Sequence, residues 1–266
     1  MELGMEGVAL AGGLFLLGLV FGSFANVVIH RLPEGGSLVS PPSSCPSCGE
    51  RISPKDNVPV LSWLLLRGRC RGCAAPISRT YPIVELAMGA LFALVGWRIG
   101  ATWALLGYLL FAWTLLVVAV IDLRTRRIPN RLTYPLTPVL LGLMVVAALL
   151  GGQPSIALRS LFGGLAAFGA LLVLALISPR GMGMGDVKLA AFIGVGLGYL
   201  GWAHVLLGIF GAFLVGGVIA IGLLLTGMRK RKDQIPFGPY MAVSAMLALL
   251  AGQPLIDAYV RATGLG

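Results

Sequence analysis

Apolar residues occur along this chain in long blocks that polar segments separate. The first block runs from Val8 to about Ile29, and a polar insert of residues 30–80 follows it. Further apolar blocks lie at about 82–98, 101–121, 134–150, 160–178, 187–200, 203–227 and 237–252. Because a helix of about 20 apolar residues spans a bilayer, the pattern predicts an all-α polytopic membrane protein with about eight transmembrane helices.

Composition agrees with this prediction. Of the 266 residues, 58% are hydrophobic and 11% are charged, and the mean hydropathy is +0.93. The first block is expected to persist as a helix, because Glu2 and Glu6 stand where a signal peptide carries positive charge. A net charge of +10 would suggest a nucleic-acid ligand in a soluble chain. Here its distribution is better explained by membrane topology, and we expect no nucleic-acid partner.

The basic residues fall mainly on one side of the predicted membrane. Seventeen of the 20 Lys and Arg residues lie in the 30–80 insert, the 122–133 loop, the 178–188 segment and the 228–236 loop. Loops rich in Lys and Arg remain in the cytoplasm, so both termini are expected on the periplasmic side. The run Arg229-Lys230-Arg231-Lys232 is expected to anchor this topology and to contact anionic membrane lipids.

The stretch Gly181-Met-Gly183-Met-Gly185-Asp186-Val-Lys188 lies between two apolar blocks. An acidic residue at membrane depth is a functional candidate by default. Glycines in front of it permit irregular backbone and the close approach of a substrate. The alternative is a surface turn in which Asp186 caps the following helix.

A second acid, Asp122, closes the block at 101–121 and falls on the same predicted cytoplasmic side as Asp186. Two carboxyl groups held close together share one proton, so that one can activate water while the other polarises a carbonyl. This is the chemistry of aspartic peptide hydrolysis. The alternative is an interfacial ion pair of Asp122 with Arg124 or Arg126.

Four cysteines form two tight pairs in the polar insert. Cys45-x-x-Cys48 and Cys70-x-x-Cys73 are separated by 21 residues, which is near the usual spacing of a four-cysteine zinc site. The reducing cytoplasm disfavours disulfides. The spacing predicts a closed, tetrahedral structural Zn²⁺ site that stabilises the insert and takes no part in hydrolysis.

Several motifs occur in an order that resembles a known family. They are Gly22-Ser-Phe-Ala-Asn26-Val-Val-Ile-His30-Arg31-Leu-Pro33, Pro59-Val-Leu-Ser-Trp63-Leu-Leu-Leu-Arg67-Gly-Arg-Cys70, Tyr81-Pro-Ile-Val-Glu85, Asp122 with Ile128-Pro129-Asn130, and Gly183-Met-Gly185-Asp186. Together they resemble the type IV prepilin leader peptidases and N-methyltransferases, a family of membrane aspartyl proteases with a Gly-x-Gly-Asp signature. The resemblance covers nearly the whole chain.

The resemblance implies a bifunctional enzyme of type IV pilus or type II secretion assembly in the bacterial inner membrane. Such enzymes cut the basic leader of prepilin or pseudopilin substrates after a glycine, then methylate the new N-terminus with S-adenosylmethionine. It also implies a catalytic pair, Asp122 and Asp186, with Gly183, Gly185 and Lys188 in the active-site loop. No Gly-rich dinucleotide-type fingerprint marks a methyl-donor site, so the residues that bind the donor are not predicted.

The predicted organisation has three parts: a first transmembrane helix at 1–30, a zinc-binding insert at 31–80 that includes the methyltransferase region, and a protease domain at 81–266. Asn26 is a candidate for the methyl-transfer site, and the resemblance implies the same for Glu85, for which an ion pair with a buried Arg is the alternative. For Asn26, a purely structural contact between helices is an equal alternative. A different class of function also fits the pattern: a non-catalytic adapter, or a transporter in which the two acids conduct protons or cations.

Overall fold

The computed structural model describes residues 5–178, 182–226 and 236–264, so the predicted anchor at 229–232 and the first glycine of the 181–188 stretch lie outside it. Its backbone is helical, and among the described residues the only β-structure is two isolated bridges in the insert. The elements in chain order are α1 (Met5–Arg31), η1 (Pro54–Asp56), α2 (Leu61–Leu65), α3 (Thr80–Ile99), α4 (Leu105–Thr125), α5 (Asn130–Leu150), α6 (Pro154–Ile177), α7 (Met184–Leu200), α8 (Trp202–Leu225) and α9 (Gly238–Thr263).

Eight of these helices coincide with the eight predicted apolar blocks. Seven of the eight, all except α7, are long and apolar enough to cross a membrane, as judged from the described residues. Helix α7 has 17 residues, a length of about 26 Å, which is near the lower limit for a span. The predicted all-α membrane architecture is confirmed.

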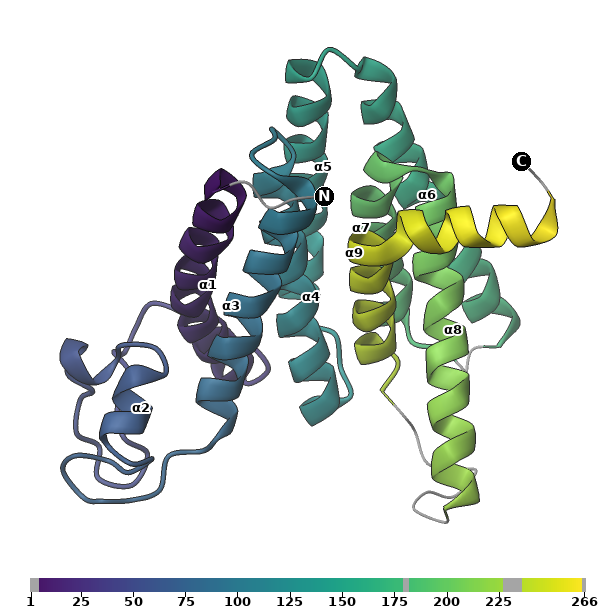
Figure 1. Ribbon diagram of the computed structural model, residues 1–266. Helices are drawn as coiled ribbons and strands as arrows, with labels where there is room; N and C mark the ends of the chain where they lie inside the picture. Colours follow the sequence, from purple (N-terminus) through teal and green to yellow (C-terminus); the bar gives the residue numbers. More distant parts are fainter. Residues whose placement is uncertain (1–4, 179–181, 227–235, 265–266) are drawn as a thin grey trace. The chain divides into compact units, whose positions relative to one another are not determined.

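The chain forms two compact units, residues 1–101 and 102–266. In the first unit α1 and α3 pack along their length, and the insert with η1 and α2 follows α1 in the chain (Figure 1). Glycines allow this close packing: a Cβ on Gly18 would lie 2.7 Å from the backbone of Gly89, and one on Gly22 would lie 2.6 Å from the Cα of Glu85. Two small residues four apart on one helix face are a common device for close helix contact in membranes.

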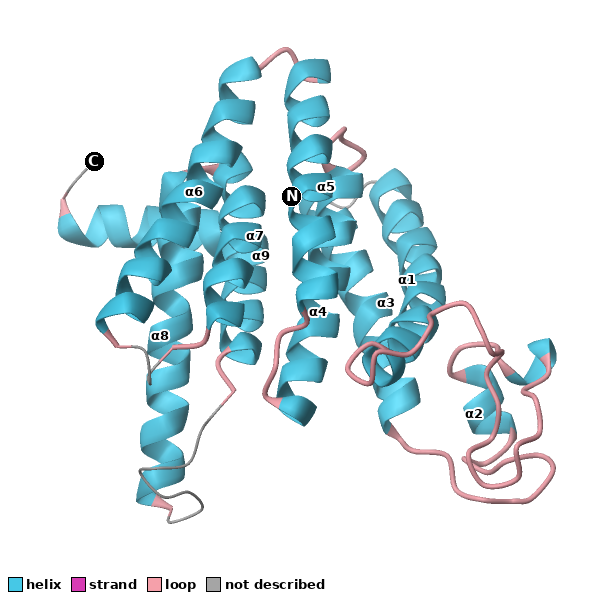
Figure 2. Ribbon diagram, turned by 180° about the vertical axis from the view of Figure 1, so that it is seen from behind, coloured by secondary structure: helices cyan, strands magenta, loops and turns pink. Residues whose placement is uncertain are grey.

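The second unit is built around α7. This helix contacts α4, α5, α6, α8 and α9, and in Figure 2 its label lies between those of α6 and α9. Gly194 and Gly163 bring α7 and α6 together, since a Cβ on either glycine would collide with the carbonyl oxygen of the other. Arg159 of α6 donates hydrogen bonds to the carbonyl oxygens of Gly198 and Tyr199, which satisfies the C-terminal end of α7.

Helix α9 is longer than its apolar block predicts. The block ends at residue 252, but the helix continues through Pro254 to Thr263. Figure 1 shows the helix bending sharply in this part. Proline lacks an N–H and crowds the preceding turn, so it bends the helix instead of ending it. The residues after the bend are mostly exposed and include polar ones, which is why hydropathy missed them.

Candidate active site and metal centre

Asp122 lies in the last turn of α4, where its residue is only 4% exposed. Its Oδ2 accepts a hydrogen bond of 2.9 Å from the backbone N–H of Gly238, the first residue of α9. The N-terminus of a helix carries a partial positive charge and unpaired N–H groups, so it favours a negative side chain. The fold therefore provides α9 as the partner for this buried carboxyl group.

Asp186 lies in the first turn of α7 and is partly exposed. Its Oδ2 accepts a hydrogen bond of 3.2 Å from the N–H of Gly183, the residue that caps the helix. The capping arrangement expected as an alternative is thus present. Helices α4 and α7 contact each other, and Ile128 of the loop after α4 lies against Gly185, so Asp122 and Asp186 stand at neighbouring helix ends.

The loop between α4 and α5 packs against the glycines before Asp186. A Cβ on Gly185 would lie 3.0 Å from the Cβ of Ile128, so a larger residue would press on this loop. Lys188, two positions after Asp186, donates a hydrogen bond of 2.9 Å to Oδ1 of Asn130 at the start of α5. Its Nζ also lies 4.7 Å from the ring centroid of Tyr134. Lys188 therefore connects the start of α7 to the start of α5.

Gly238 is the residue of this site that the sequence reasoning missed. A Cβ at this position would lie 2.8 Å from Oδ2 of Asp122, so only glycine allows the carboxyl group its present position. The Phe237-Gly238-Pro239 sequence at the start of an apolar block was the available signal. Without the fold, nothing distinguishes this glycine from the many that merely pack helices.

The four cysteines form a second site, in the first unit. Their Sγ atoms all lie within 4.8 Å of one another, and those of Cys45 and Cys73 are 3.8 Å apart. Zinc–sulfur bonds of about 2.3 Å in a tetrahedron require sulfur separations of about 3.8 Å, so the cluster fits Zn²⁺. Backbone N–H groups of Cys48 and Ser47 lower the pKa of the Cys45 thiol to about 6, whereas neighbouring thiols raise the pKa of Cys48 and Cys73. A bound cation would offset the repulsion among four thiolates. The predicted metal-binding cluster is therefore confirmed as a site that can hold an ion.

The two cysteine pairs sit on backbone turns of the same design. In each, the N–H of the first cysteine donates to the carbonyl five residues later: Cys45 to Glu50, and Cys70 to Ala75. An isolated bridge closes each turn, Ser44 with Arg51 and Arg69 with Pro76. Positive φ angles occur at the residue after the second cysteine of each pair, 72° at Gly49 and 58° at Ala74. The cysteines thus approach the common centre from two matched knuckles.

Comparison with known proteins shows which family the chain resembles over most of its length. Residues 16–99 match the Bacterial Peptidase A24 N-terminal domain, and residues 109–221 match the Type IV leader peptidase family. Proteins named prepilin leader peptidase/N-methyltransferase are similar over most of their length. The one from Aeromonas hydrophila is 38% identical, over 92% of this chain and 92% of the relative. Those from Pseudomonas aeruginosa and Bacillus subtilis are each 35% identical, over 94% and 93% of this chain and 93% and 97% of the relative.

The chain belongs to the type IV leader peptidase family. No solved structure matches it. Membership confirms the predicted family and the enzyme class, a membrane peptidase whose relatives are also named N-methyltransferases. It favours an enzyme over the adapter or transporter considered as alternatives.

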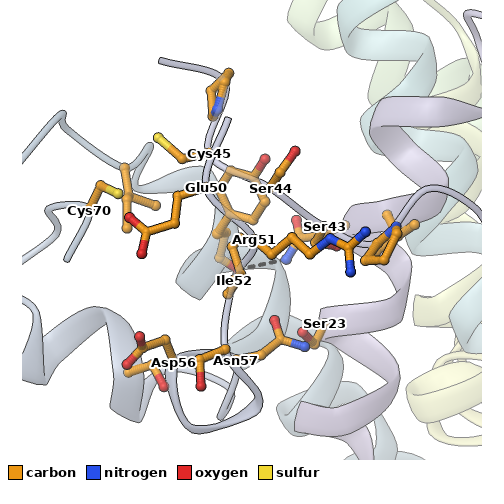
Figure 3. A pocket seen from close by; sticks show the side chains of 18 of the residues that line it. Ser23, Ser43, Ser44, Cys45, Glu50, Arg51, Ile52, Asp56, Asn57 and Cys70 are labelled. Atoms are coloured by element: carbon orange, nitrogen blue, oxygen red, sulfur yellow. Dashed lines mark hydrogen bonds between the residues drawn. The ribbon is translucent and has the colours of Figure 1, made fainter. Parts of the chain in front are cut away.

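In this member of the type IV leader peptidase family, the first unit also contains a large cavity that is partly open to solvent. Its volume is about 960 Å³, near the upper end of the range for small-molecule sites. Figure 3 shows part of its lining, which includes Ser23 of α1, Asn57 after η1 and Cys45 of the metal cluster. The cavity therefore extends from the α1–α3 pair to the cysteine knuckles.

Proposed function

We propose that this chain is a prepilin leader peptidase that hydrolyses its substrate with Asp122 and Asp186 and then methylates the new N-terminus. The observation that carries the peptidase assignment is the approach of these two carboxyl groups from separate helices. Each is tied by one oxygen to a backbone N–H at a helix start, Gly238 in one case and Gly183 in the other. A carboxylate has about four lone-pair positions, so both groups keep acceptor capacity for water and substrate.

The pair can act as a general acid and a general base. One ionised carboxylate takes a proton from water, which attacks the carbonyl carbon of the scissile amide. The other, protonated, donates a hydrogen bond to the carbonyl oxygen and stabilises the charge that develops there. Because two adjacent carboxyl groups share one proton, the required pair of protonation states arises without a further residue.

The family resemblance extends the proposal to substrate and location. The substrates are prepilins or pseudopilins whose short basic leader is cut after glycine. The enzyme resides in the bacterial inner membrane with both termini in the periplasm, because 17 of its 20 Lys and Arg residues fall on the side that carries both acids. The metal is Zn²⁺ in a structural role, since an ion bound by all four cysteines would have no open coordination position. S-adenosylmethionine is the methyl donor.

The test is cleavage of a purified prepilin by the full chain in detergent, with and without S-adenosylmethionine, followed by the mass of the product's N-terminus. Asp122→Asn and Asp186→Asn should each lower the cleavage rate by roughly 10²- to 10⁴-fold, the usual contribution of a general acid or base. Asp257→Asn, which changes an exposed acid on α9, is the matched control and should cleave normally. Normal cleavage by either of the first two variants would refute the assignment of the pair.

A further inference from the structure

Two buried polar side chains face the cavity of the first unit. Asn26 of α1 and Glu85 of α3 both line it, and they are only 3% and 7% exposed. The amide nitrogen of Asn26 donates a 3.1 Å hydrogen bond to the carbonyl oxygen of Tyr81. Its Oδ1 is buried and accepts no hydrogen bond from any residue that the structure describes. A buried acceptor without a donor costs free energy, so this atom indicates a missing donor group.

Glu85 is held in place by an unusual turn. Its Oε2 accepts a 2.7 Å hydrogen bond from the N–H of Val60, and its carboxyl group also accepts one from the hydroxyl of Ser23. Val60 has φ 60° and ψ −49°, and the N–H of Leu61 bonds to the carbonyl of Pro59 around it. This is a γ-turn in a strained conformation, which is rare for a β-branched residue and is typical of functional sites. The turn fixes the orientation of the carboxylate.

The helix register brings the two groups together. On α1, Gly18, Gly22 and Asn26 are spaced by four residues, and on α3 Tyr81 and Glu85 have the same spacing. Gly22 lies against Glu85 and Asn26 against Tyr81, so the seam between the helices ends at the cavity. The result is a carboxylate and an unused amide oxygen, both acceptors, at one wall of a chamber.

We propose that Asn26 and Glu85 bind the α-ammonium group of the cleaved substrate and that Glu85 removes its proton for methylation. This inference rests on the N-methyltransferase function proposed above and assigns the amine site of that reaction. An ammonium group offers three donors, and the two side chains offer acceptors that the fold leaves open. A cationic donor suits the Glu85 carboxylate better than a neutral one, and an anionic ligand without donors would be repelled by it.

The proton has to leave because an ammonium nitrogen has no lone pair. Glu85 accepts that proton, and the neutral amine nitrogen attacks the methyl carbon of the sulfonium donor. The new C–N bond forms as the C–S bond breaks, and the bonding pair stays on sulfur, which becomes a neutral thioether. The product is a secondary ammonium group, and the proton on Glu85 returns to water.

The experiment uses the full-length enzyme and a mature pilin that already has its free N-terminus, so that cleavage is not required. Methylation is followed by product mass across a pH series. In the wild type the rate should be nearly flat from neutral pH to about pH 8, the pKa of an α-amine. With Glu85→Gln only spontaneously neutral amine reacts, so the rate should fall roughly five- to tenfold at pH 7. Below pH 7 it should fall about tenfold further per pH unit, and near pH 8 it should approach a plateau.

The matched control is Glu34→Gln, which alters an exposed acid of the same unit outside the cavity lining and should behave as wild type. A second measurement compares binding of the mature pilin with its N-acetylated form, without methyl donor. The wild type should prefer the free amine by roughly 10- to 100-fold, and both Glu85→Gln and Asn26→Leu should reduce this preference. Metal content and prepilin cleavage by each variant report its folding.

The outcomes separate this inference from the function on which it rests. If the wild type neither cleaves prepilin nor methylates mature pilin, the proposed function is wrong. If the wild type methylates but Glu85→Gln keeps its rate and a flat pH profile, the assignment of Glu85 is overturned. A variant that is slower by the same factor at every pH, with its amine preference intact, would show that Glu85 supports only the structure of the cavity.

Discussion

Replacing Gly238 with alanine tests whether the position of Asp122 governs the peptidase. The added Cβ would lie 2.8 Å from Oδ2 of Asp122, below the closest approach that such atoms tolerate. The atom it meets is the free end of a side chain, so the carboxyl group can rotate away. The 2.9 Å hydrogen bond from the Gly238 N–H is then lost or lengthened.

The expected magnitudes differ for stability and activity. A hydrogen bond to a charged group contributes about 1.5–3 kcal/mol, while alanine favours a helical position over glycine by up to about 1 kcal/mol. The net destabilisation should therefore be about 0.5–3 kcal/mol. A displacement of about 1 Å in a reacting group costs on the order of 10²-fold in rate. We expect Gly238→Ala to cleave prepilin roughly 10- to 100-fold more slowly while remaining folded.

The assay is the initial rate of prepilin cleavage, measured with thermal unfolding in the same detergent. Gly142→Ala on α5 is the control, because a Cβ there meets no atom within 4 Å. Gly238→Ala cleaving at the wild-type rate would refute the reasoning. Equal losses in both variants would indicate a general sensitivity of these helices to alanine.

Two further predictions concern the remaining contacts of the sites. Lys188→Met removes the hydrogen bond to Asn130 and should slow prepilin cleavage about tenfold, whereas Lys188→Arg should retain part of the rate. Equal cleavage rates in the wild type and both variants would show that this hydrogen bond is dispensable. Cys70→Ser should lose the metal, measured as zinc per purified chain, while the control Asp257→Asn should keep it. Full zinc content in Cys70→Ser would show that the cysteine cluster is not the binding site.

The hydrophobic blocks predicted the helices well. In lipid a chain has to pair its backbone N–H and C=O groups within a helix, and the side chains of that helix are mainly apolar along its length. The cysteine cluster was equally predictable, since ligand spacing alone places two knuckles around one ion. The pairing of Asp122 with Asp186 stays a prediction for catalysis, although the fold brings their helix ends together.

Other features depend on contacts that a sequence does not display. Hydropathy ended α9 at residue 252, because it does not distinguish a proline that bends a helix from one that ends it. The role of Gly238 depends on which helix start meets Asp122, a contact across 116 positions of the chain. The unused oxygen of Asn26 likewise becomes visible only when every neighbouring donor is known.

The enclosure of α7 has a consequence for how the enzyme responds to its lipids. Because five neighbouring helices surround this short helix, bilayer thickness acts on the outer helices and reaches α7 only through them. The distance between Asp186 and Asp122 is then determined by the contacts of α7 with its neighbouring helices, several of which are made at glycines. Peptidase activity should accordingly vary little among lipids of different chain length, as long as the bundle around α7 stays assembled.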